Sequence, residues 1–151
     1  MKRTIYLAIG LICSIYSNQS YAQSTASKTA RFANYPKIMY CNAAAISKLF
    51  TIKQGEQAVL NFNDQLSFKG AIVRKISKFN NTLQTLAIQL PELDNSILLI
   101  SKRTATNNSE VFIGHLYNNK FSEGFQLIAG KNGEYEMVKI AVNQVMQPCN
   151  L

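Results

Sequence analysis

Residues 83–117 read LQTLAIQLPELDNSILLISKRTATNNSEVFIGHLY, and this stretch decides the fold class. Leu86, Ile88 and Leu90 alternate with smaller or polar residues, which is the period of a β-strand with one buried face. The turn PELDN and the polar loop 104–109 separate this strand from two further apolar runs, 97–100 and 111–117. Short strands at this spacing, with turns between them, predict an antiparallel all-β domain.

The same pattern continues on both sides, and the further strand-like runs lie at 58–62, 68–76, 121–129 and 135–141. One segment, Asn42–Phe50, has helical spacing instead, with Asn42 as its N-cap and an apolar face of Ala43, Ile46, Leu49 and Phe50. We therefore predict a small closed or partly open antiparallel barrel of about seven strands with one short N-terminal helix.

The run 68–76 carries an irregularity. Phe68, Gly70, Ile72 and Ile76 share one parity and are predicted to share one face, but Arg74 interrupts that face. Glycines inside strands often mark bulges or tight bends, as we expect here for Gly70, Gly114 and Gly124.

The first 22 residues have the layout of a secretory signal peptide. Lys2 and Arg3 precede an apolar stretch, and small residues stand at the −3 and −1 positions of a cut after Ala22. Cys13 offers the alternative of lipoprotein processing, although Ile12 before it does not fit that motif. We predict a signal peptide over 1–22, an extended arm over 23–40 and a barrel domain over 41–151. Cleavage would remove two of the 16 basic residues and leave a net charge of +6.

The predicted exported chain keeps two cysteines, Cys41 and Cys149. In an oxidising compartment such a pair usually forms a disulfide, so we expect this bridge. The alternative is that Cys41 is a free thiol that ligates a metal in another protein.

The residues contain no recognisable catalytic arrangement. His115 is the only histidine of the 151 residues, and the strand alternation places it on the surface, opposite Gly114 and Leu116. The eight acidic residues are scattered, and no nucleotide, hydrolase or zinc motif occurs. We expect no enzyme activity, no cofactor and no metal site.

The excess of basic residues raises the question of an anionic partner. Sixteen Lys and Arg against eight Asp and Glu give a net charge of +8. The densest basic group is Lys69, Arg74, Lys75 and Lys78, with Lys102 and Arg103 as a second pair. Phe68, Phe79 and Tyr117 could stack on bases, but the scatter of the charges favours a surface without nucleic acid.

The order of four motifs resembles a known kind of module. These are FKGAIVRKIS (68–77), LLISKRT (98–104), GHLYNN followed by SEGFQL (114–127), and GEYEMVKI (133–140) before the last cysteine. The pattern is similar to the β-barrel modules that precede secreted metallopeptidases in Gram-negative bacteria, and to the stand-alone barrel inhibitors called potempins. The resemblance implies that the protein binds and inhibits a secreted metallopeptidase. From the signal peptide and the lack of a second long apolar run, we expect a periplasmic or secreted protein without a membrane span. We also expect a monomer.

A rigid barrel can place an extended arm or loop in a peptidase cleft as an added strand. The candidate contact residues are Arg31, Phe32 and Tyr35 in the arm, and Thr104, Asn107 and Asn108 in the loop 104–109. Two alternatives remain, a carrier barrel for a small apolar ligand and an envelope-associated interaction protein held by its charge. The carrier would need an interior that its side chains do not fill.

Overall fold

The computed structural model describes residues 28–62, 66–131 and 133–142. The predicted signal peptide, Cys13 and Cys149 lie outside the described residues. The elements, in chain order, are β1 (Ile38–Asn42), α2 (Ala43–Leu49), β2 (Gln57–Phe62), β3 (Leu66–Lys78), β4 (Leu83–Leu90), the 3₁₀ turn η2 (Pro91–Leu93), β5 (Ser96–Thr104), β6 (Glu110–Tyr117), β7 (Glu123–Ala129) and β8 (Glu134–Ala141).

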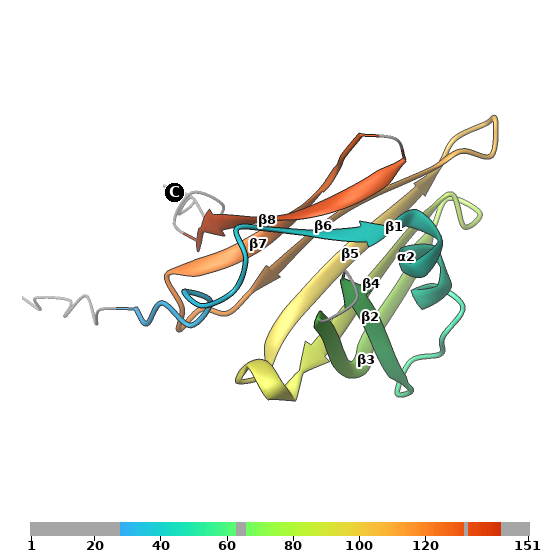
Figure 1. Cartoon of the computed structure of the whole chain (residues 1–151). Coiled ribbons are helices and arrows are strands. Elements are labelled where there is room, and N and C mark those ends of the chain that lie inside the picture. The colour runs from blue at the N-terminus through green and yellow to red at the C-terminus, as the bar shows by residue number, and fades with distance from the viewer. Residues whose placement is uncertain (1–27, 63–65, 132, 143–151) are drawn as a thin grey trace, which may run out of the picture.

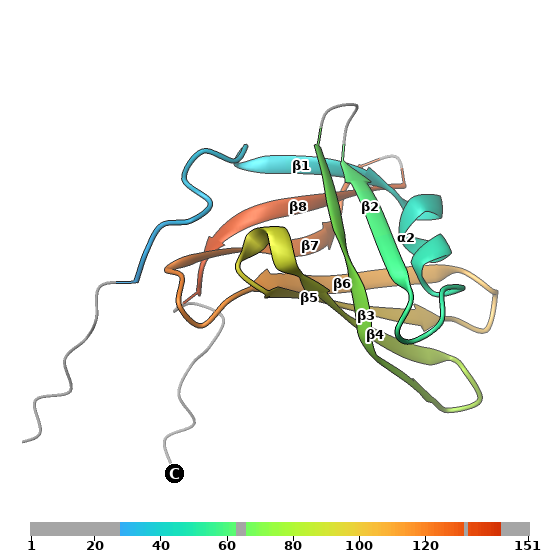
Figure 2. The same cartoon turned by 90° about the horizontal axis from the view of Figure 1, so that it is seen from below.

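The strands form one antiparallel sheet that curls into a barrel (Figures 1 and 2). Strands β2 to β8 follow one another as a meander, and β1 pairs with β8, so the sheet order is β1-β8-β7-β6-β5-β4-β3-β2. No ladder joins β1 to β2 among the described residues, and α2 packs against both of these strands at the gap. The predicted all-β, partly open barrel with one short helix is therefore confirmed, with eight strands in the described part of the chain instead of about seven.

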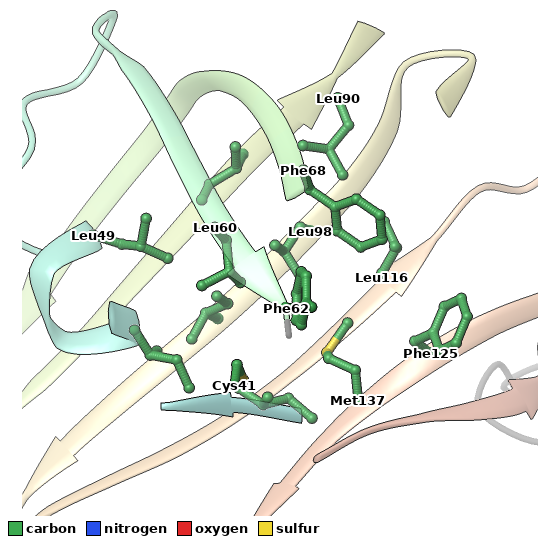
Figure 3. Packing of buried hydrophobic residues seen from close by; sticks show 14 of the residues in the cluster. Cys41, Leu49, Leu60, Phe62, Phe68, Leu90, Leu98, Leu116, Phe125 and Met137 are labelled. Carbon is green, nitrogen blue, oxygen red and sulfur yellow. The ribbon is translucent and has the colours of Figure 1, made fainter. Parts of the chain in front are cut away.

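The interior of the barrel is filled with large apolar side chains. Figure 3 shows side chains from β1, β2, β3, β6, β7 and β8 that point toward one another. Among the fully buried ones are Phe32, Phe62, Phe112, Phe125 and Met137. The predicted face of the helix is confirmed, since Ile46, Leu49 and Phe50 are buried and the Asn42 side chain accepts a hydrogen bond from the Ala44 amide at 2.7 Å.

Strand β3 corrects the predicted parity. Ile72 pairs with Ile88 but Arg74 pairs with Ala87, so Val73 is an extra residue, a β-bulge. Beyond the bulge the two faces exchange, because side chains alternate strictly along a strand. Ile76 therefore lies on the outer face opposite Thr85, and Lys75 points inward. Gly70 allows β3 to approach β4 closely, since a Cβ there would lie 2.1 Å from the Gln89 carbonyl oxygen.

Strand β1 and the segment before it belong to the barrel. The predicted arm covered 23–40, but Ile38–Asn42 forms a ladder with β8 in which Met39 and Cys41 point inward. Two inward positions are too few for the alternation of β1 to stand out in the sequence. The described part of the arm is therefore a structural element of the domain.

The barrel has two differently closed ends (Figures 1 and 2). At the arm end, the segment 28–37 lies across the opening beside the turns 91–95 and 118–122. At the helix end lie α2 and the hairpin turns 79–82 and 105–109. No helix of the described residues is long and apolar enough to cross a membrane.

Candidate partner-binding site

The six predicted contact residues lie at opposite ends of the barrel. Arg31, Phe32 and Tyr35 are at the arm end, where Arg31 contacts Asp94 just before β5 begins. Thr104, Asn107 and Asn108 are at the far end of that strand, which at about 3.3 Å per residue is more than 25 Å away. The structure therefore divides the predicted site into two separate candidates.

At the arm end, the N-terminal segment is attached to the barrel by backbone contacts. Thr29 forms a parallel bridge with Phe121, and the Ser122 amide donates to the Thr29 carbonyl at 3.2 Å. The segment then turns, with the Tyr35 amide bonded to the Phe32 carbonyl at 2.9 Å. These bonds fix the direction in which the chain arrives at the barrel.

Lys139 of β8 holds the turn from inside. Its ammonium donates to the carbonyl oxygens of Phe32 at 2.5 Å, Tyr35 at 2.9 Å and Ala33 at 3.4 Å. Three acceptors satisfy all three ammonium protons, and hydrogen bonds to a charged donor are the stronger kind. A sequence scan could not have found this role, because the lysine lies 104 residues or more from its acceptors.

Phe32 closes the arm end and corrects one predicted contact. Its ring is fully buried and packs edge-on against Phe121 and Phe125, with centroids 5.7 and 5.3 Å away. A side chain in this position stabilises the fold and cannot meet a partner while the domain is folded. The polar, aperiodic sequence around Phe32 gave no sign of its burial.

Arg31 and Tyr35, by contrast, remain accessible. The Arg31 guanidinium forms an ion pair with Asp94 at 3.2 Å, and both side chains are about half exposed. Tyr35 is half-buried against Phe32 and Phe68. Exposed ion pairs contribute little to stability, so Arg31 is available to a partner at small cost.

An open groove of about 440 Å³ runs along β8 at the same end. Strand β1 begins at Ile38, opposite Val138, so no described strand pairs with Ile140 and Ala141 on that side. A free sheet edge is where an extended segment of another chain can be added. The sequence missed this groove, because it follows from the short length of β1. Its lining is Lys37, Ile38, Glu123, Val138, Lys139, Ile140 and Ala141.

The second candidate is the tip of the β5–β6 hairpin. The Asn107 side chain accepts hydrogen bonds from the Ser109 amide and hydroxyl, and Asn108 has a positive φ of 62°. The Thr104 amide donates to the Thr82 carbonyl at 2.8 Å. The tip is exposed, but its polar groups are largely used within the turn and by the neighbouring hairpin.

The described residues offer no cluster of metal-ligating side chains. No three of their His, Cys, Asp and Glu side chains lie close enough to hold a metal ion. His115 lies half-buried on the outer face, in an apolar hollow of about 210 Å³ lined by Leu99, Tyr117 and Ile140. No carboxylate lines that hollow to orient the imidazole, as general base catalysis would require.

Cys41 is buried inside the barrel and forms no disulfide with another described residue. Burial raises its pKa to about 12, so the thiol stays protonated and is a poor metal ligand. This placement contradicts the alternative in which Cys41 ligates a metal in another protein. Its predicted bridge to Cys149 falls outside the described residues and stays a prediction.

Among protein-family models, curated proteins and solved structures, none matches this chain.

Proposed function

We propose that this protein is exported, has no enzyme activity, and binds and inhibits a secreted metallopeptidase through its arm end. The observation that carries the proposal is the clamped segment 28–37. Lys139 and Phe32 hold its turn against a filled barrel, so the chain ahead of Lys28 starts from a rigid base. Pre-organisation of this kind lowers the entropy lost on binding.

The edge of β8 that no described strand covers also supports the arm end as the contact surface. A partner strand could pair with the backbone of Ile140 and Ala141 while Arg31 and Tyr35 contact its side chains. The metallopeptidase class of the target comes from the resemblance of the strand motifs, and the blocking of the cleft is its implied mechanism.

The carrier alternative is less well supported. A carrier barrel needs an internal cavity, whereas the interior here holds Phe32, Phe62, Phe112 and Phe125, all with 1% exposure or less. Filled interiors are typical of small barrels whose function lies on the surface.

The test is an inhibition assay with the purified exported protein against secreted metallo-, serine and cysteine peptidases. We expect dose-dependent loss of metallopeptidase activity only, unchanged in His115→Ala. Absence of inhibition in every class, together with a small apolar molecule that co-purifies with the protein, would establish the carrier instead.

A further inference from the structure

The charges of the barrel are divided between its two halves. Strands β2, β3, β4 and β5 contain no Asp or Glu, and they carry six Lys and Arg. The acids of the other strands include Glu134 and Glu136 on β8. One half of the outer surface is therefore positively charged.

Two of the six basic residues do not reach that surface. Lys75 points inward and donates to the carbonyls of Phe50 and Ile52 at 2.6 and 3.0 Å, and Lys102 forms an ion pair with Glu110 at 2.9 Å. The other four basic residues have no ion pair among the described residues. Each is paired across the sheet with a residue whose side chain points outward, so they lie on the outer face. They are Lys69, Arg74, Lys78 and Arg103.

The β3–β4 hairpin adds an exposed aromatic ring to these charges. Phe79 follows Lys78 directly and is 74% exposed, the highest value among the large hydrophobic side chains described. Its φ is +52°, a conformation that a bulky residue rarely adopts. We call Lys69, Arg74, Lys78, Phe79 and Arg103 the cationic face.

Hydrogen bonds hold the backbone of this turn at Phe79. The Thr82 amide and hydroxyl both donate to the Phe79 carbonyl, at 3.1 and 2.8 Å, and the Thr82 carbonyl accepts from Thr104 of β5. Backbone strain that the surroundings maintain is characteristic of functional sites. The turn therefore projects the Phe79 ring into solvent from a backbone that is held in place.

We propose that the cationic face docks the barrel on an anionic lipid surface, with Phe79 inserted at the level of the headgroups. Lys78 and Arg103 stand two strand spacings apart, about 10 Å, so each can meet its own headgroup. Val73 precedes Arg74 in the chain, and Val59 is the cross-strand partner of Lys69. Both valines are more than 40% exposed. Cations mixed with aliphatic side chains suit a lipid interface.

Nucleic acid fits the same face less well. Binding of single strands relies on several stacking rings, and Phe79 is the only aromatic side chain of the cationic face. Phe68, which the sequence offered as a second platform, is buried in the core, and Tyr117 lies on β6. This proposal does not depend on peptidase inhibition.

The absence of Trp from the chain allows a direct test, because Phe79→Trp introduces a single fluorescent reporter. The exported protein is mixed with phosphatidylcholine vesicles, with or without about one-third phosphatidylglycerol. We expect a blue shift of the emission with the anionic vesicles only, reversed by about 0.5 M salt, at which charges are strongly screened. Ile128→Trp, at an exposed position on β7 outside the cationic face, should shift less.

Charge variants locate the contact. Each cation near an anionic surface is worth about fivefold in partitioning. The triple variant Arg74→Gln, Lys78→Gln, Arg103→Gln should therefore sediment with anionic vesicles at least tenfold less. The matched control, Lys37→Gln, Lys120→Gln, Lys131→Gln, removes the same charge from other elements and should bind far better. Phe79→Asn removes the ring, so binding to anionic vesicles should fall. Because Asn tolerates the positive φ at this position, the variant should keep its stability.

Three results would overturn the proposal. The first is equal binding to neutral and anionic vesicles. The second is an equal loss of vesicle binding in the two triple variants. The third is an emission shift of Phe79→Trp with a single-stranded oligonucleotide or poly-glutamate but not with vesicles. The last result would assign the face to a nucleic acid or to an acidic protein.

Discussion

Phe32 is the residue that joins the N-terminal segment to the core. Its ring is fully buried and contacts Tyr35, Phe121 and Phe125, whereas the neighbouring Arg31 is accessible and forms one exposed ion pair. Two adjacent residues thus have different roles, one in stability and one at the surface.

Replacing Phe32 by Ala should lower the free energy of unfolding by about 3–5 kcal/mol, because the cavity left at the barrel end cannot fully collapse. Arg31→Ala is the control, with an expected cost of less than about 1 kcal/mol. Denaturant unfolding monitored by circular dichroism measures both. Equal, small effects would mean that the segment does not close the barrel.

Cys41 makes a second prediction at this scale. Because burial raises its pKa to about 12, the reduced thiol should react with maleimide at pH 8 at least about a hundredfold more slowly in the native protein than in urea. Peptide mapping identifies the labelled cysteine. Rapid native labelling of Cys41 would contradict its position inside the barrel.

The mass of the non-reduced exported protein tests the bridge separately, since a disulfide removes two hydrogens. Cys41 pairs with Tyr135, six residues before Ala141, which is about 20 Å along β8. A bridge to Cys149 requires the chain beyond β8 to return over that distance.

At the scale of elements, two inward-pointing lysines each hold the segment that lies at one end of the barrel. Lys139 donates to three carbonyls of the arm-end turn, and Lys75 donates to two carbonyls just after α2. Lys139 lies at least 104 residues beyond its acceptors and Lys75 at least 23, so each end segment is held by a strand that comes later in the chain.

Lys139→Met should free the arm-end turn and cost about 2 kcal/mol, because the carbonyls lose a charged donor. Limited trypsin digestion should then cleave faster after Arg31. Lys75→Met is the matched control. It should lose similar stability at the helix end of the barrel, but trypsin should not cleave faster after Arg31. Identical digestion of both variants would show that Lys139 does not hold the segment.

The sequence predicted the elements that have a repeated signal. The alternation in β4 and the Asn42 cap of α2 were sufficient for the barrel and its helix. The sequence could not predict the bulge at Val73, which exchanges the faces of β3, or the burial of Phe32, because both depend on partners far along the chain. Of the predicted contacts, Arg31 and Tyr35 stay accessible at the arm end, and Phe32 does not.

At the scale of the whole molecule, the barrel has a filled interior and separate surfaces. The arm end carries the clamped segment and the part of β8 that no described strand pairs with. The outer face of β3 to β5 carries Phe79 and cations without an ion pair among the described residues. Both proposals therefore concern the surface of the barrel, because its described interior is filled by side chains.

The most direct test of this account is the inhibition constant for a metallopeptidase that the protein inhibits, measured for two variants. One carries Arg31→Ala and Tyr35→Ala at the arm end, and the other carries Asn107→Ala and Asn108→Ala at the opposite end. We predict that the arm-end variant raises the constant about tenfold or more, which is the effect of losing one major interface contact, and that the hairpin variant leaves it unchanged. An unchanged constant for the arm-end variant together with a large increase for the hairpin variant would contradict binding through the arm end.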